Sequence, residues 1–150
     1  MSDALPSVVI RPAEPPDLAR IIALDAEMTG VEKRSYWEDT YARFSGREKR
    51  HFLVAEDRTG AVKGYIVGEV RAYEFGSEPC GWVMAIGVDP RFRVRRVGER
   101  LFEAVCERLR ADGVATVRTM VARTDVLDMA FFRAQGMMAG PFIELEKPLD

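Results

Sequence analysis

Residues 88–101 read VDPRFRVRRVGERL, and this stretch decides which fold the sequence predicts. It holds five arginines and one glutamate within residues 91–100, a local charge of 5 − 1 = +4, although the chain of 150 residues has a formal net charge of −2. A nearly continuous apolar run, GWVMAIGV at 81–88, precedes it and is typical of a central strand. Apolar residues at every fourth position follow it and predict a helix. A strand, a strongly basic turn and a helix therefore follow one another here.

The start of that helix is suited to binding an anion. The first N–H groups of an α-helix have no partner within the helix, and the helix dipole adds partial positive charge there. Arginines at 93, 95 and 96 are unfavourable at such a position unless a negative group offsets them. Because neither GK[ST] nor G-x-G-x-x-G is present, the turn is not a P-loop or a dinucleotide fingerprint. The pattern favours a small anionic ligand, with a solvated arginine-rich surface as the alternative.

The rest of the chain predicts one α/β domain over residues 1–150, without internal repeats or linkers. Alternating or continuous apolar runs predict the strands, and apolar residues at helical spacing, bounded by Asp17, Gly30, Gly113 and Asp125, predict the helices. We expect strands at 7–11, 51–56, 61–73, 81–88, 115–121 and 141–146, and helices near 17–30, 35–44, 96–113 and 125–136.

Composition excludes several classes of protein. No apolar run reaches 18 residues and the first residues do not resemble a signal peptide, so we expect a cytoplasmic protein that does not bind membranes. Two cysteines give no disulfide framework, and with His51 as the only histidine no metal site is expected. Outside the basic turn the chain carries about −6, which argues against binding nucleic acid. The oligomeric state is left open, with a homodimer as one option.

Two segments resemble the GNAT (Gcn5-related) N-acetyltransferase family. VDPRFRVRRVGERLFEAV at 88–105 is similar to the signature V-x-P-x-x-[QR]-x-x-G-x-[GA], and TDVLDMAFFRAQGM at 124–137 is similar to a second family segment near the C-terminus. The resemblance covers nearly the whole chain. It implies a mixed, mostly antiparallel central sheet flanked by helices, with acetyl-CoA as the co-substrate and no metal.

The resemblance also implies which residues contact the cofactor. The strand end would hydrogen-bond the pantetheine arm, the turn and helix start would bind the pyrophosphate, and Asp125 would face the cofactor. Arg96 and Val94 stand where the family has glycines, so side chains occupy positions at which the backbone approaches phosphate. The predicted cofactor-binding residues are Ile86, Gly87, Val88, Arg93, Val94, Arg95, Arg96, Val97, Gly98, Asp125 and Phe132.

Catalytic residues are less well marked. The Val88 amide would donate to the oxyanion of a tetrahedral intermediate, but Phe132 replaces the tyrosine that protonates the leaving thiolate in many family members. Tyr36, Tyr65 and Tyr73 are alternative donors. Glu69 is a candidate base acting through water, or an outward-facing strand residue. Residues expected near the acceptor amine are Glu27, Tyr36 and Trp37.

The resemblance therefore implies direct acetyl transfer from acetyl-CoA to a primary amine. The amine could belong to a small molecule, a protein N-terminus or a lysine. The alternative is a catalytically weak acyl-CoA-binding sensor or interaction module of the same fold, which the residues at positions 96 and 132 motivate.

Overall fold

The computed structural model describes residues 8–150, apart from the side chains of residues 93–95. The chain divides into two compact units, the first ending at Thr119 and the second running from Met120 to Asp150. The single domain over 1–150 stays a prediction. Among the described residues, no helix combines the length and the apolar composition that crossing a membrane requires.

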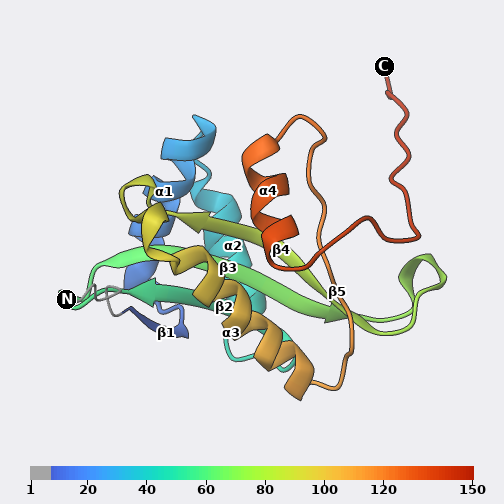
Figure 1. The fold of residues 1–150 in the computed structure, drawn as a ribbon. Coiled ribbons are helices and arrows are strands. Elements are labelled where there is room, and N and C mark those ends of the chain that lie inside the picture. The colour runs from blue at the N-terminus through green and yellow to red at the C-terminus, as the bar shows by residue number, and fades with distance from the viewer. Residues whose placement is uncertain (1–7) are drawn as a thin grey trace. The chain divides into compact units, whose positions relative to one another are not determined.

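A mixed, mostly antiparallel sheet of five strands forms the centre of the first unit (Figure 1). Strands β1 to β4 follow one another as antiparallel neighbours, and β5 pairs with β4 in parallel after the crossover through α3. This confirms the predicted fold class. The strands are β1 Val9–Pro12, β2 Arg50–Glu56, β3 Val62–Arg71, β4 Cys80–Val88 and β5 Val117–Arg118.

Helices α1 (Leu18–Thr29) and α2 (Arg34–Phe44) cover one face of this sheet. Helix α1 follows Asp17 and ends at Gly30, whose φ of +82° is a left-handed conformation that glycine adopts without strain. Both ends lie where they were predicted, but the Asp17 carboxylate makes no capping hydrogen bond to α1; it accepts from the Glu14 amide and pairs with Arg11. The two helices and the strands share one buried cluster, whose members include Ile21, Ile22, Trp37, Phe44, Phe52, Val54, Tyr65 and Val67.

Helix α3 (Val97–Ala111) packs on the opposite face, against a row of glycines (Figure 1). A Cβ atom added to Gly64 would lie 3.0 Å from Leu101 Cδ1, and one added to Gly81 would lie 2.6 Å from Leu109 Cδ1. Gly68 meets Val105 in the same way, at 3.0 Å from Cγ2. The glycines let the helix lie close to the sheet, which fixes its first turn beside the end of β4.

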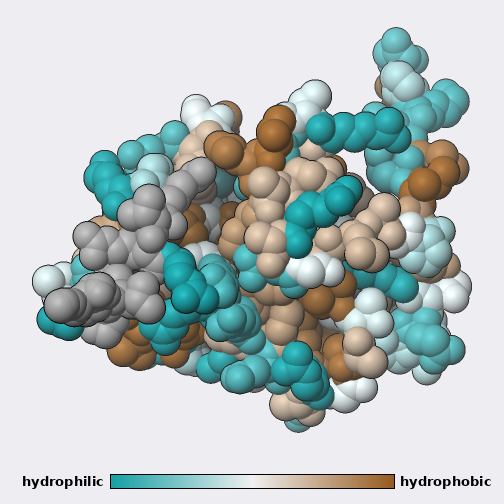
Figure 2. All heavy atoms as spheres, viewed as in Figure 1, coloured by the Kyte–Doolittle hydropathy of each residue, from teal (hydrophilic) through white to brown (hydrophobic). Residues whose placement is uncertain are grey.

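The second unit contains helix α4 (Val126–Ala134), whose first turn is capped by Asp125 as predicted. The Asp125 carboxylate accepts a hydrogen bond from the Asp128 amide at 3.0 Å. The strand predicted at 141–146 is wrong, because these described residues form no ladder with any other described segment. Their alternating side chains are exposed instead, and Figure 2 shows hydrophobic residues among hydrophilic ones in this C-terminal segment.

Candidate active site

Within residues 8–119, the second half of β4 has no strand neighbour on the side of β5. Pairing between these strands is limited to Gly81 with Val117 and Trp82 with Arg118, so within residues 8–119 the backbone of 84–88 has no ladder partner on that edge. On the other edge, a register shift leaves Met84 as an extra residue. The N–H and C=O groups that point away from β3 are therefore available to an extended ligand with amide groups.

One buried carboxylate builds the turn that follows β4. Asp89 is 1% exposed. Its Oδ1 atom accepts hydrogen bonds from the backbone N–H of Arg91 at 3.0 Å and from Arg91 Nε at 2.9 Å. The Asp89 amide in turn donates to the carbonyl of Lys63 at 2.8 Å. These contacts fix the six-residue 3₁₀-helix at Pro90–Arg95, about two turns, which carries the chain into α3.

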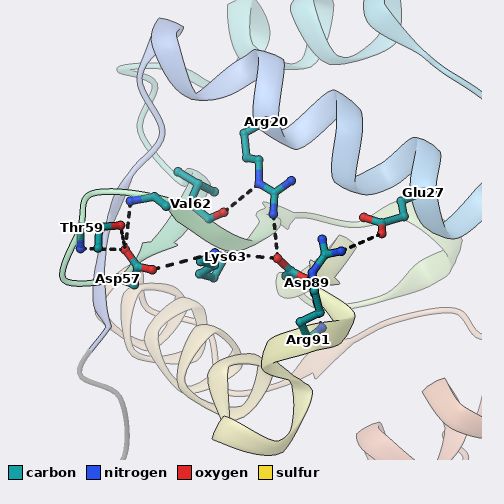
Figure 3. Close-up of polar contacts among 9 residues, drawn as sticks. Arg20, Glu27, Asp57, Thr59, Val62, Lys63, Asp89 and Arg91 are labelled. Carbon is teal, nitrogen blue, oxygen red and sulfur yellow. Dashed lines mark hydrogen bonds and ion pairs between the residues drawn. The ribbon is translucent and has the colours of Figure 1, made fainter.

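Basic side chains from three elements surround this carboxylate (Figure 3). Arg20 Nη2 on α1 lies 2.7 Å from Asp89 Oδ2, and Lys63 Nζ on β3 lies 4.0 Å from the same atom. Burial alone would raise the pKa of Asp89, but the hydrogen bonds from Arg91 and the charges of Arg91 and Arg20 outweigh it and hold this pKa below its usual range. The turn is therefore held in place by an ionised aspartate.

The arginine run is partly neutralised by the protein itself. Arg91 also reaches Glu27 on α1, with Nη1 3.6 Å from Oε2. Arg96 forms an ion pair with Glu99, and Arg100 Nη1 donates to the carbonyl of Val8 at 2.7 Å. The side chains of Arg93 and Arg95, like that of Val94, lie outside the described residues. An anion at this turn would be met by the remaining positive charge and by backbone amides.

Those amides are at the start of α3. Arg96 is the residue before the helix, has φ +62° and ψ +24°, and makes no side-chain capping hydrogen bond within the described part of the chain. Val97 is buried, whereas Gly98 is half-buried in the first turn. The positive φ of Arg96 explains why glycine is expected at this position. The helix start predicted as an anion site thus has no side-chain cap from Arg96, although Glu99 lies in the same turn.

A second group of side chains lies on the α1–α2 face beside the end of β4. The Cζ and Oη atoms of Tyr65 lie 2.5 Å from the position that a Cβ atom on residue 87 would occupy, so the ring fits only against Gly87. Tyr65 packs edge-on against Trp37, with ring centroids 5.1 Å apart. Trp37 is 2% exposed, and its Nε1 donates to Asp25 Oδ2 at 3.0 Å. Tyr36 contacts Trp37 but is itself exposed.

The other predicted residues are placed as follows. Ile86 pairs with Ile66 in the β3–β4 ladder, and Val88 pairs with Gly64 at the last position of that ladder. Glu69 is held by Arg71 Nε at 3.0 Å and by Arg50 Nε at 3.7 Å. These two ion pairs across neighbouring side chains favour a structural role for Glu69.

Asp125 and Phe132 belong to the second unit, where Phe132 is buried and packs edge-on against Phe131 with centroids 5.1 Å apart. Their contact with a cofactor stays a prediction.

Sequence reasoning missed two buried acidic residues, Asp25 and Asp89. Asp25 follows Ile21 and Ile22 by four and three positions, a spacing that puts it on the buried face of α1. Asp89 precedes Pro90, an arrangement typical of a turn whose aspartate side chain accepts from the backbone. Helical spacing and turn chemistry could have found both residues.

Comparisons with known proteins show what the chain is similar to. A model described as "Acetyltransferase (GNAT) family" matches residues 18–137. Among curated proteins, none matches the chain.

Solved structures with the same fold include two aminoglycoside acetyltransferases. The 6'-N-acetyltransferase AAC(6')-Ih from Acinetobacter baumannii is 16% identical with a TM-score of 0.80, covering 96% of this chain and 100% of the other. The aminoglycoside N-acetyltransferase AAC(6')-Iy, in complex with CoA, is 14% identical with a TM-score of 0.81, covering 99% of each chain. Naa20 from Chaetomium thermophilum, in complex with a bisubstrate analogue, is 25% identical with a TM-score of 0.70, covering 85% of this chain and 70% of the other.

Proposed function

The chain belongs to the acetyltransferase (GNAT) family, and from this premise we propose that it transfers the acetyl group of acetyl-CoA to a primary amine. One observation carries the proposal: the unpaired edge of β4 leads, through the turn built on Asp89, directly to the start of α3. The strand edge and the helix N-terminus thus follow each other along the chain. The edge suits the amide groups of an extended ligand, and the helix N-terminus suits the pyrophosphate of the same ligand.

The residues of this chain that would hold acetyl-CoA follow from that arrangement. The backbone of 84–88 would bind the pantetheine arm, and the amides from Val97 onward would face the pyrophosphate. The co-substrate supplies an activated thioester, and the amide of Val88, beside it, would donate a hydrogen bond to the carbonyl oxygen as negative charge develops. Site residues in the second unit, Asp125 and Phe132, are proposed to complete this binding.

Tyr65 is proposed to supply the proton that Phe132 cannot. Among the three tyrosines considered, Tyr65 is the one whose hydroxyl reaches the end of β4, at Gly87. The hydroxyl is protonated at neutral pH and can donate; burial, together with the charge of Asp25, raises its pKa, so the proton must pass to the sulfur as the carbon–sulfur bond breaks and thiolate charge develops. Tyr73 is 73% exposed on the β3–β4 connection, and Tyr36 is 48% exposed. The position of Tyr65 supports a role in protonating the leaving thiolate.

Release of free CoA with a broad panel of primary amines tests this function. We expect saturable release that depends on both acetyl-CoA and amine, with the acetylated amine identified by mass spectrometry. Saturable acetyl-CoA binding without turnover for any amine would instead support the acyl-CoA-binding module, which the residues at positions 96 and 132 motivate. Absence of acetyl-CoA binding would exclude both.

A further inference from the structure

A buried carboxylate on α1 holds an ammonium group. Asp25 is 7% exposed, and its Oδ2 atom accepts from Lys33 Nζ at 2.9 Å and from Trp37 Nε1 at 3.0 Å. The same ammonium donates to Thr29 Oγ1 at 3.0 Å. Two oxygen acceptors, one of them a carboxylate, that converge on one ammonium group form a site able to bind a primary ammonium.

The ammonium group in this site belongs to Lys33, whose side chain can move into solvent. Lys33 lies between the two helices, directly before α2, and its side chain is 35% exposed. Asp25, in contrast, belongs to the core face of α1, and Trp37 is packed in the buried cluster. Since the carboxylate and the indole are fixed while the lysine stem reaches solvent, the lysine is the replaceable partner.

This ammonium site is connected to the end of β4 by direct contacts. Trp37, which donates to Asp25, packs edge-on against Tyr65, and the Tyr65 hydroxyl lies against Gly87. Gly87 directly precedes Val88, whose amide is proposed to face the thioester. The ammonium site and the proposed transfer site therefore lie on the same face of the sheet, and one row of aromatic side chains joins them.

We propose that Asp25 and Thr29 anchor one ammonium group of the acceptor and that Lys33 occupies this place until an acceptor displaces it. An ammonium paired with a carboxylate keeps its proton more firmly, so it is a poor nucleophile. The amine that attacks must then be a second one on the same molecule. The acceptor class is accordingly a diamine or oligoamine, and this inference rests on the proposed acetyl transfer.

Cadaverine and pentylamine, which differ only in the second amino group, provide the kinetic test. Wild-type protein should acetylate cadaverine with a KM at least about tenfold lower, the size of one charge-assisted hydrogen bond. Asp25→Asn, whose amide oxygen can still accept from Trp37, should lose this preference by raising KM with little change in kcat. Asp39→Asn removes the same charge from an exposed pair on α2 and should keep the preference. Equal KM values for the two amines in the wild type would overturn the proposal.

Thermal unfolding of Lys33→Met provides a readout that needs no turnover. Lys33→Met leaves the buried Asp25 carboxylate without its ammonium partner, so the variant should melt at a lower temperature than wild type. Cadaverine should restore this melting temperature at concentrations that do not change the melting temperatures of wild type and Asp25→Asn. If cadaverine does not raise the melting temperature of Lys33→Met above the value measured without cadaverine, the site takes no external ammonium and the inference fails. Acetylation of amines without a preference for diamines would reject this inference but not the proposed function. Failure to acetylate any amine would reject the proposed function, and the thermal test would then decide whether the ammonium site exists.

Discussion

Arg96 forms a two-point ion pair with Glu99, with Nε 2.7 Å from Oε1 and Nη2 2.5 Å from Oε2. The pair lies across the first turn of α3, and the hydrogen bond from Arg96 lowers the pKa of Glu99. Arg96 therefore offsets an acidic side chain that would otherwise repel a phosphate at the same helix start. Its guanidinium is directed to Glu99, while its backbone takes the left-handed conformation of the glycine it replaces.

Arg96→Gly should therefore keep acetyl-CoA binding. Glycine adopts φ +62° without strain, and removing the side chain gives the phosphate closer access to the backbone. We expect Arg96→Gly to melt at a higher temperature than Arg96→Ala, which loses the same ion pair but keeps the strained backbone. Calorimetric titration with acetyl-CoA should give an affinity for Arg96→Gly equal to or above that of wild type. A loss of about tenfold or more would identify Arg96 as a phosphate ligand instead.

The contact between Gly87 and Tyr65 predicts a local loss of stability. In Gly87→Ala the new methyl group would meet the Tyr65 ring at about 2.5 Å, and such overpacking costs about 1–3 kcal/mol of the free energy of unfolding. Gly140→Ala is the matched control, because nothing lies within 4 Å of a Cβ atom there. Urea unfolding of both variants measures the difference. Equal stability would mean that the ring does not lie against residue 87.

Asp89 predicts an acid-sensitive contribution to stability. Its pKa is lowered in the folded state, so its contribution is fully present above the unfolded value of about 4 and is lost as the pH falls through the lower folded value. Asp89→Asn should reduce the free energy of unfolding at neutral pH by about 3 kcal/mol, the low end for a broken buried ion pair, since Arg20 and Arg91 are partly exposed.

Urea unfolding at pH 7 and near pH 3 separates this effect from a general loss of stability. The wild type should lose more stability between the two pH values than Asp89→Asn does, and the variant should also bind acetyl-CoA more weakly because the turn loses its anchor. A wild type and variant with the same pH dependence would show that Asp89 is not ionised in the fold.

Tyr65→Phe should lower kcat by roughly 100-fold if its hydroxyl protonates the leaving thiolate. Tyr36→Phe and Tyr73→Phe should have little effect, since both side chains are exposed. Steady-state kinetics with a saturating amine measures the effect, and the melting temperature of Tyr65→Phe controls for packing. Unchanged kcat in a folded Tyr65→Phe protein would remove tyrosine from the reaction.

Local signals in the sequence account for much of the fold. Asp17 and Gly30 flank α1, and the apolar run at 81–88 lies within β4, so both elements could be predicted from a few residues each. The segment 141–146 alternates like a strand but forms none, and β5 is shorter than its alternation suggests. Strand pairing depends on partners far away in the chain, which alternation does not report.

In the candidate site, too, features formed by consecutive residues were predictable and contacts between distant elements were not. The basic turn and the helix start after it could be predicted, because strand, turn and helix are consecutive in the chain. Helical spacing and turn chemistry could locate Asp25 and Asp89, but the partners of Asp89 and Tyr65 on other elements, Arg20 and Gly87, could not be predicted. For Glu69 the sequence suggested a base, but the fold places two arginines beside its carboxylate that the sequence pattern does not report.

The most direct test of acetyl-CoA binding at the start of α3 is the change in melting temperature that acetyl-CoA produces in wild type and in Gly98→Trp. Gly98 is half-buried in the first turn of that helix, so a tryptophan there would block the phosphate without replacing a core side chain. We predict that acetyl-CoA raises the melting temperature of the wild type and does not change that of a folded Gly98→Trp protein. The same increase in both proteins would contradict the placement of the cofactor.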